Sequence, residues 1–391
     1  MKHRHIGLVI GTEGEHARRV LRGVSRFARE SGRSWLFYLT PHYQPNLKGL
    51  AAWKPAGVLT LVENPRLVEE VLALGKPAVN VAYWLDDARL PLVGNDNAAI
   101  GRAVAAHFLE RNFHHFAYIG WPAYLFSDQR EAGFRSAVEE AGYHCVCYPG
   151  RPHRPRWRLT DSVADHERLR RWLARLAIPS AIMASNDIRA WQVLQACQEL
   201  ERHVPEEIAV VGVDNDEAWC LLAQPSLSSV AVAAEQIGYL AAAKLARLLA
   251  GRRVEHQTVV PPLGVIARRS SDTLAIGDRT VAAVVRFIRE HTDRPIGIGD
   301  VLKAVPVSRR AMERAFRRVL GRSPAAEIRQ AHLRRATDLL ASTDLGMADV
   351  ARLSGFTSSK HLATVFRQHT NQTATQYRKQ FRFPLPAAAS E

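Results

Sequence analysis

Short apolar runs alternate with amphipathic stretches from residue 5 to about residue 270. Runs rich in β-branched residues, such as His5–Ile10, predict strands that are buried on both faces. Between them, stretches such as Glu15–Ser31 place Val20, Val24 and Phe27 at helical spacing and predict helices with one apolar face. Strands that alternate with helices favour parallel sheets joined by crossover helices. The first two-thirds of the chain is therefore expected to have an α/β fold.

This alternation runs through two similar halves, the second of which begins near Ala99. We expect two lobes, with the chain passing between them more than once, and a cleft that closes on a small ligand. Ligands of such sheets bind beyond the carboxyl ends of the strands. Polar residues follow several predicted strands there, in Asn95–Asn97, Asn186–Asp187 and Asp214–Glu217. Carboxylates and amides suit sugar hydroxyls, but the same residue types also cap helices and form turns, so both interpretations stay open for each segment.

Near the C-terminus, Ile298–Arg378 form a longer helical span that contains two short helix-turn-helix patterns. In the first, a turn at residues 306–308 precedes a helix whose inner face carries Met312 and Phe316, and Ser308 is placed to cap that helix. In the second, Gly355 occupies the turn, where a positive φ is required. Pro324 begins a longer helix between the two copies. The sequence therefore predicts an all-α tandem helix-turn-helix domain at the C-terminus.

The second helix of each copy has the size and polarity to enter the major groove of B-DNA. Amphipathic helices with exposed arginines could also form an ordinary solvated bundle, but the tandem repeat with matched turns favours DNA binding. The expected DNA contacts are the caps and exposed side chains of these two helices: Ser308, Arg309, Arg310, Arg314, Ser358, Ser359, Lys360 and Thr364.

The net charge of the 391-residue chain supports a nucleic-acid partner because it is concentrated near the C-terminus. The whole chain carries a formal charge of +15. Residues 278–391 contain 20 Lys and Arg against 10 Asp and Glu, which is two-thirds of the excess. Cations that neutralise phosphates release counterions, so DNA binding by this region should weaken as salt rises.

Other features of the sequence restrict compartment and chemistry. No run of 18 apolar residues occurs, and the first apolar run is too short for a signal peptide, so a cytoplasmic protein that does not enter membranes is expected. The four cysteines, Cys145, Cys147, Cys197 and Cys220, lack zinc-ligand spacing and are expected to be reduced. No phosphate loop, hydrolase elbow or metalloprotease motif occurs. We therefore expect no catalytic residue, cofactor or metal.

The C-terminal patterns resemble a known DNA-binding family over about 100 residues. The resemblance rests on Ser308–Phe316, Gly321–Pro324, Arg335–Ala336, Gly355–Phe356 with Phe366–Arg367, and Tyr377–Arg378. These segments are similar to the DNA-binding domain of the AraC/XylS activator family. Leu362 and Ala374 stand where the family often has Phe and Pro. The resemblance implies a transcription regulator that reads promoter half-sites.

Residues 5–270 resemble the effector domain of the LacI and periplasmic sugar-binding family. The matching segments are Val93–Asn97, Ala117–Gly120, Arg130–Phe134, Ala184–Asp187, Pro205–Asn215 and Leu227–Val230. The resemblance implies that Arg130 and Asp214 bind ligand hydroxyls, that Asn186 and Asp187 assist, and that Arg18 also contacts the ligand. The helix-turn-helix that precedes this domain in LacI repressors does not occur here, because the first predicted strand begins at once.

Together these observations predict an effector-binding domain at residues 1–272 and a DNA-binding domain at residues 273–391. The combination implies a sugar-responsive activator of a sugar-utilisation operon, with a pentose such as xylose as effector. We expect it to act as a homodimer on promoter half-sites, with RNA polymerase as a further partner. A DNA-modifying enzyme is the alternative, but it would need a reactive cysteine or a metal centre. A sugar-binding protein without DNA function would leave the basic C-terminus unexplained.

Overall fold

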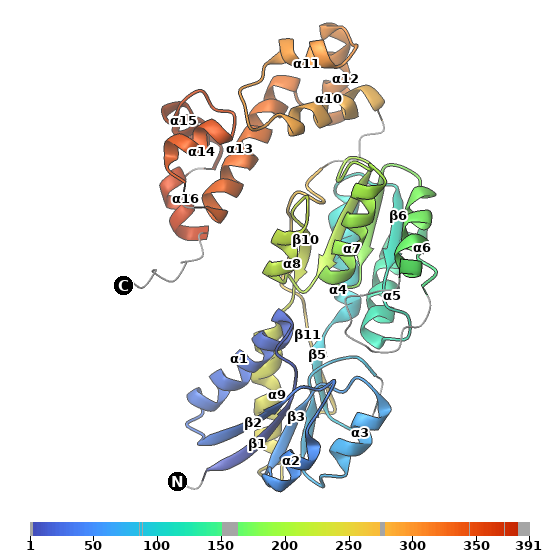
Figure 1. Ribbon diagram of the computed structural model, residues 1–391, viewed down its shortest axis with the longest axis vertical. Coiled ribbons are helices and arrows are strands. Elements are labelled where there is room, and N and C mark those ends of the chain that lie inside the picture. The colour runs from blue at the N-terminus through green and yellow to red at the C-terminus, as the bar shows by residue number, and fades with distance from the viewer. Residues whose placement is uncertain are drawn as a thin grey trace. The chain divides into compact units, whose positions relative to one another are not determined.

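The computed structural model describes residues 3–85, 87, 89–150, 163–273, 278–343, 345–370 and 372–381. The chain divides into two compact units, Met1–Ala275 and Ile276–Glu391. Figure 1 shows that the first unit contains two α/β lobes and that the second is helical. The predicted fold class, an α/β two-lobed domain followed by an all-α domain, is confirmed.

The N-terminal unit is built from two six-stranded sheets, ordered β11-β5-β4-β3-β1-β2 and β12-β10-β9-β8-β6-β7. Its strands are β1 (Arg4–Val9), β2 (Trp35–Thr40), β3 (Gly57–Thr60), β4 (Ala78–Asn80), β5 (Leu92–Asn95), β6 (His115–Ile119), β7 (Cys145–Cys147), β8 (Ser180–Ala184), β9 (Ile208–Val213), β10 (Ser228–Ala231), β11 (Gln257–Val260) and β12 (Gly264–Ile266). Neighbouring strands pair in parallel, apart from the antiparallel pair β10 and β12, which the sequence analysis did not predict.

Helices cover both faces of these sheets, which is why the central strands read as continuous apolar runs. The helices are α1 (Glu15–Glu30), α2 (Leu47–Ala52), α3 (Pro65–Leu72), α4 (Asn97–Leu109), α5 (Leu125–Glu140), α6 (Val163–Ala174), α7 (Asp187–Glu199), α8 (Glu217–Leu222) and α9 (Ala234–Leu248). In α1, the predicted stripe of Val20, Val24 and Phe27 is buried. We call the lobe that contains β1 the N-terminal lobe and the lobe that contains β9 the C-terminal lobe.

The chain passes between the lobes at three places, after β5, after β10 and after β11. The last passage returns it to the C-terminal lobe, where residues 268–273 leave the unit. This exit segment is fastened to the C-terminal lobe by Ser270, whose Oγ donates to Val210 O at 2.6 Å and whose N–H donates to Ser226 O at 3.0 Å. The exit segment is thus hydrogen-bonded to the C-terminal lobe, although the chain connects the two lobes at three places.

Helices α1 and α9 lie side by side in the N-terminal lobe (Figure 1) and approach each other through two glycines. A Cβ atom on Gly23 of α1 would lie 1.9 Å from Glu235 O, and a Cβ atom on Gly238 of α9 would lie 1.9 Å from Val20 O. Both clashing atoms belong to the backbone, so they cannot move aside as the end of a flexible side chain could. Glycine at both positions therefore sets the distance between these helices.

The C-terminal unit contains seven helices within its described residues: α10 (Arg279–Glu290), α11 (Ile298–Ala304), α12 (Arg309–Leu320), α13 (Pro324–Ser342), α14 (Met347–Leu353), α15 (Ser359–Thr370) and α16 (Ala374–Phe381). They form two apolar cores that α13 joins: Ile328 packs with Met312 and Phe316 in the first, and Leu340 packs with Phe366 in the second. The predicted tandem arrangement is confirmed.

Local signals at the turns of this unit also match the prediction. Ser308 Oγ accepts a hydrogen bond from Ala311 N at 3.3 Å, Pro324 occupies the first turn of α13, and Gly355 has a φ of 76°. Helix α10 was not predicted, although Val281, Val284, Val285 and Ile288 bury one helical face in the first core. Within the described ranges, no helix combines the length and apolar character needed to cross a membrane.

Candidate functional site

The carboxyl ends of strands from the two lobes lie close together in the N-terminal unit. The backbone N–H of Glu15, after β1, donates to Asp216 Oδ2 at 3.1 Å, and Arg19 donates to Asn215 O at 3.3 Å. The two acceptors belong to the loop after β9 in the other lobe. A further hydrogen bond joins the two lobes: the N–H of Phe126 in the C-terminal lobe donates to Tyr83 O in the N-terminal lobe at 2.7 Å. We call the region between these contacts the inter-lobe site.

Arg130 belongs to the inter-lobe site and is only 3% exposed. Its Nε donates to Asn97 Oδ1 at 3.0 Å, and Nη1 donates to Ser185 O. Its Nη2 lies 3.9 Å from Asp214 Oδ1, so the structure brings together the two residues that the resemblance predicted as the main ligand contacts. Burial lowers the pKa of Arg130, and the negative charge of Asp214 opposes that shift. The pair is loose enough for a hydroxyl group to bridge it.

The loop that carries Asp214 has an unusual backbone conformation. Asp214 has a φ of 107° and Asn215 a φ of 49°, both in the region that favours glycine. Such conformations cost about 1–3 kcal/mol each and persist where the surroundings enforce them. Here Ser229 Oγ accepts from Asn215 N at 2.9 Å, and Arg268 of the exit segment donates to Asn215 Oδ1 at 2.7 Å. The surrounding contacts therefore hold the backbone of the loop that carries Asp214.

Asp187 and Asn186 support this loop through the protein's own hydrogen bonds. Asp187 is buried, with Oδ1 accepting from Ser229 Oγ at 2.5 Å and Oδ2 accepting from Asp216 N at 2.8 Å. Burial, together with the charge of Asp214, raises the pKa of Asp187 well above its ordinary value. Asn186 caps α7 by accepting from Arg189 N at 2.9 Å. Direct ligand contact by these two residues stays a prediction.

Arg18 organises the loop between β1 and α1. Its Nη1 donates to Thr12 O and Glu13 O, both at 2.9 Å, and its Nε bonds Glu15 at 3.0 Å. The side chain is 41% exposed. Its predicted contact with a ligand is not part of this hydrogen-bond set and stays a prediction.

Several residues of the inter-lobe site were missed by the sequence analysis. They share a position directly after a strand or at the start of a helix: His16, His42, Glu63, Trp84, Tyr124 and Phe126. The ring of Trp84 from the N-terminal lobe lies 5.0 Å from Tyr124 and 5.5 Å from Phe126 of the other lobe. The strand-end rule could have identified His42, Glu63 and Trp84, since they follow β2, β3 and β4.

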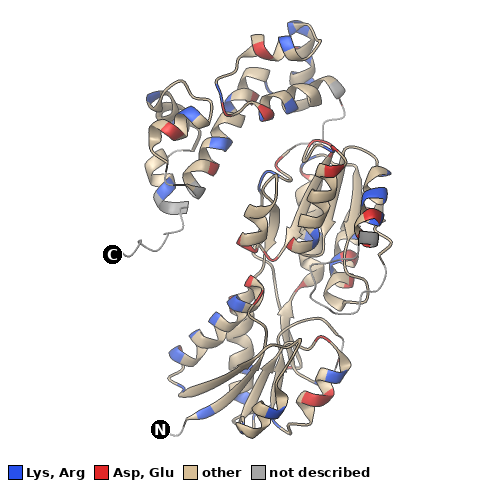
Figure 2. Cartoon of the chain, viewed as in Figure 1, with Lys and Arg blue, Asp and Glu red and all other residues tan. Residues whose placement is uncertain are grey.

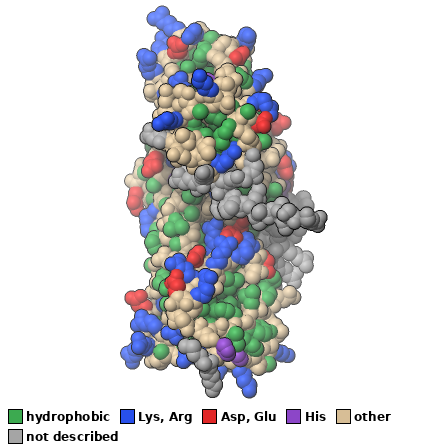
Figure 3. Space-filling model, turned by 90° about the vertical axis from the view of Figure 1, so that its left-hand side faces the viewer, with side chains coloured by type: hydrophobic (Ala, Val, Ile, Leu, Met, Phe, Trp, Pro, Cys, Tyr) green, Lys and Arg blue, Asp and Glu red, His purple; other side chains and the backbone are tan. Residues whose placement is uncertain are grey.

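The expected DNA contacts occupy the outer sides of α12 and α15. All eight side chains, from Ser308 to Thr364, are exposed. Ser358 caps α15 by accepting from His361 N at 3.1 Å, and Arg309 pairs with Glu313 at 3.0 Å. Lys and Arg residues are spread over the helices of this unit in Figure 2 and stand out from its surface in Figure 3. The two helices thus present polar and basic groups suited to base edges and phosphates.

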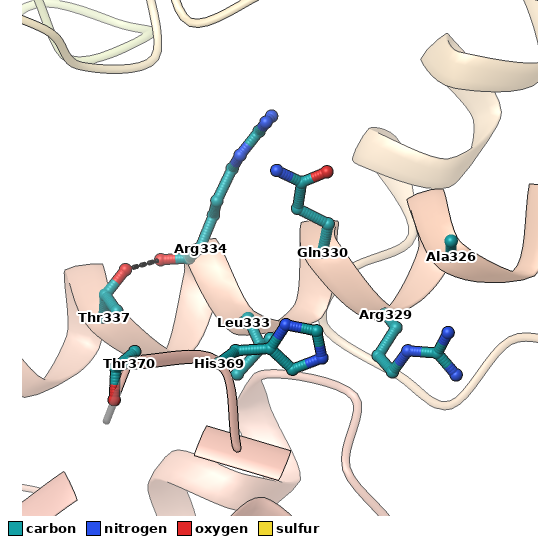
Figure 4. Close-up of a pocket in the computed structure, with 8 residues that line it drawn as sticks. All are labelled: Ala326, Arg329, Gln330, Leu333, Arg334, Thr337, His369 and Thr370. Carbon is teal, nitrogen blue, oxygen red and sulfur yellow. Dashed lines mark hydrogen bonds between the residues drawn. The ribbon is translucent and has the colours of Figure 1, made fainter. Parts of the chain in front are cut away.

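A pocket of about 380 Å³ lies beside these helices, between α13 and the end of α15. Figure 4 shows the side chains that line it: Ala326, Arg329, Gln330, Leu333, Arg334, Thr337, His369 and Thr370. Two arginines and a histidine give it a basic rim. No sequence pattern indicated this pocket, because its lining combines residues of two helices.

Comparisons with known proteins match both units in the same order. Residues 105–271 match a periplasmic binding protein-like domain, and residues 301–380 match a helix-turn-helix domain. The xylose operon regulatory protein of Escherichia coli strain K12 is 31% identical over 386 residues, which cover 96% of this chain and 97% of that protein. The chain belongs to the family of xylose operon regulatory proteins.

Two further xylose regulators agree with this assignment. The xylose operon regulatory protein of Haemophilus influenzae is 27% identical, and the alignment covers 95% of this chain and 97% of that protein. The solved structure of a xylose-binding transcription activator has a TM-score of 0.82 and 29% identity, covering 98% of this chain and all of the other. As a member of this family, the chain is a transcription regulator with a sugar-sensing domain and an AraC-type DNA-binding domain.

The raised pKa values of three cysteines give little support to the alternative of a DNA-modifying enzyme with a reactive thiol. Burial raises the pKa of Cys197 to about 12 and also raises that of Cys220. A hydrogen bond with Cys147, together with burial, raises the pKa of Cys145. Thiols with raised pKa values are poor nucleophiles at neutral pH. Among the described residues, no group of three or more His, Cys, Asp and Glu side chains could hold a metal ion.

Proposed function

We propose that this chain is a xylose-responsive, or related pentose-responsive, activator of a sugar-utilisation operon that acts in the cytoplasm. Residues 1–272 serve as the sensor and residues 273–391 as the DNA reader. The observation that carries the proposal is the match to xylose operon regulators over both domains and nearly the whole length. The protein works by binding alone, without catalysis.

The sensor binds the sugar at the inter-lobe site. Arg130 and Asp214 provide a donor and an acceptor that lie 3.9 Å apart, close enough to engage neighbouring hydroxyls of one pentose. Asn186, Asp187 and Arg18 act at its edges, where they hold the loops in place. Trp84 and Phe126 offer ring faces of the kind that pack against the apolar face of a sugar. These groups select a small polyhydroxylated ligand without a charge.

Sugar binding alters DNA binding because it favours one arrangement of the lobes. A ligand shifts such an equilibrium only by its difference in affinity for the two states. The contacts of Glu15 and Arg19 with residues 215 and 216 exist only when the lobes are close, so a sugar that binds to both lobes favours that state. The reader then acts as a homodimer on promoter half-sites and recruits RNA polymerase.

A thermal-shift screen of the purified protein against pentoses and hexoses tests the sensor. Stabilisation grows as RT ln(1 + [L]/Kd), about 2.7 kcal/mol at a ligand concentration of 100 Kd. Xylose, or one related pentose, is expected to raise the Tm in a concentration-dependent way, while hexoses have little effect. If none of these sugars raised the Tm even at millimolar concentration, the proposed sensor function would be wrong.

Substitution of single basic residues tests the reader. Arg310→Ala and Lys360→Ala are each expected to weaken binding to promoter DNA of the regulated operon by roughly tenfold, since each residue meets bases or phosphates in one groove. Fluorescence anisotropy at several salt concentrations measures this. The matched control is Arg29→Ala, which removes an exposed charge from α1 in the sensor and should leave affinity unchanged. Unchanged affinity in both reader variants would show that other faces contact DNA.

A further inference from the structure

His16 lies in the first turn of α1, where the N-terminal lobe meets the loop after β9. Two neighbours of His16 in α1 make polar contacts with that loop: Glu15 N donates to Asp216 Oδ2, and Arg19 donates to Asn215 O. His16 is thus held between two contact points, opposite the loop that carries Asp214. His16 is part of α1, and the distance of α1 from α9 depends on Gly23 and Gly238.

The imidazole of His16 has an unused polar atom at this position. Nδ1 is buried and has no hydrogen-bond partner among the residues that the structure describes. A buried polar atom without a partner destabilises the protein unless something else satisfies it. Such atoms in binding sites are natural places for a ligand to supply the missing hydrogen bond.

The charged groups that face His16 come from both lobes. Asp214 and Arg130 of the C-terminal lobe and Arg19 of its own helix act on the imidazole, with Glu15 next to it in the chain. Burial, followed by the two arginines, lowers the pKa of His16 from its ordinary value of 6.5, and Asp214 opposes this. The imidazole is therefore neutral at physiological pH and can both donate and accept a hydrogen bond.

We propose that His16 is a specificity-determining ligand contact of the N-terminal lobe, and that its Nδ1 hydrogen-bonds a hydroxyl of the sugar held by Arg130 and Asp214. The inference rests on the proposed sugar-sensing function. One hydroxyl group then joins His16 to the C-terminal lobe, so the sugar itself becomes part of the contact between lobes. Sugars that lack this hydroxyl, or that orient it away, leave Nδ1 unsatisfied and bind weakly.

This contact makes sugar binding depend on pH. Protonation of His16 competes with ligand binding, because a cation there faces Arg130 and Arg19. Because burial lowers the pKa of His16 from 6.5, the imidazole stays neutral at pH 6.5, and sugar affinity is lost only at more acidic pH.

Isothermal titration of the full chain with xylose tests the proposal. His16→Phe keeps the ring volume without polar atoms and is expected to weaken binding at least about tenfold. His16→Asn places an amide near the Nδ1 position and should recover most of the affinity. The control His114→Phe changes a histidine in the C-terminal lobe that stacks on Tyr143, and should bind as the wild type does.

Deoxy analogues of xylose separate a ligand contact from a merely structural role. The wild type should discriminate strongly against one deoxy analogue, and His16→Phe should not, because the lost hydroxyl then has no partner. Equal discrimination in both proteins, or unchanged xylose affinity in His16→Phe, would overturn the assignment of His16 while leaving the sensor function intact. If the wild type bound no pentose, both the sensor function and this inference would fall.

Discussion

Asp214→Ala is expected to weaken xylose binding by about a hundredfold or more, the loss that corresponds to a charged hydrogen bond and an unpaired partner. The substitution removes the acceptor and leaves the buried Arg130 guanidinium without its nearby carboxylate, which lies 3.9 Å away in the wild type. Isothermal titration measures the affinity. DNA binding by the full-length variant without sugar should equal that of the sugar-free wild type, since Asp214 belongs to the other unit.

The backbone conformation of Asp214 calls for a second variant. Alanine tolerates a φ of 107° poorly, so Asp214→Ala could also disturb the loop. Asn tolerates positive φ better than other residues with a side chain, so Asp214→Asn keeps the conformation and removes the charge. Loss of affinity in both variants, with unchanged Tm in Asp214→Asn, assigns the effect to the carboxylate. Wild-type affinity in Asp214→Asn would show that charge at this position is not needed.

Gly238→Ala is expected to destabilise the sensor by about 3 kcal/mol or more, at the upper end of overpacking effects. The added methyl group would lie 1.9 Å from Val20 O, so α1 and α9 must move apart along their whole crossing. Thermal unfolding should show a fall in Tm on the order of 10 °C. Because α1 carries Glu15 and Arg19 to the inter-lobe site, the same change should also weaken sugar binding.

Gly14→Ala is the matched control for this prediction. A Cβ atom there meets nothing within 4 Å, and the backbone has an ordinary φ of −95°. Its only expected cost is the weaker helix-capping tendency of alanine, below about 1 kcal/mol. If Gly238→Ala unfolded at the same temperature as Gly14→Ala, the two helices would have to be separable without loss, and the role given to the glycine pair would be wrong.

The elements that the sequence predicted are those whose signals are local. Val20, Val24 and Phe27 mark α1 by spacing alone, and Ser308, Pro324 and Gly355 mark helix ends by their chemistry. Helix α10 had an equally regular signal but lies beyond the segments that carried the family resemblance. The pairing of β12 with β10 could not be predicted, because it depends on where the chain returns after β11.

The candidate site was only partly predictable for a related reason. Arg130 and Asp214 were identified from a resemblance, and the structure places them together. The difference between Asp214 and Asp187 was not visible in the sequence, because both follow strands. In the structure, the carboxylate oxygens of Asp187 accept hydrogen bonds from Ser229 Oγ and Asp216 N. His16 carried no signal because its importance arises from burial and from the other lobe.

The attachment of the exit segment has a consequence for how this protein can be divided. Ser270 hydrogen-bonds to Val210 and Ser226, and Arg268 bonds Asn215 beside Asp214, all within the C-terminal lobe. A junction made after Thr273 therefore preserves every one of these bonds. Readers of different DNA sequence preference could be exchanged at that point, giving chimeric regulators that keep one sugar response and address new promoters.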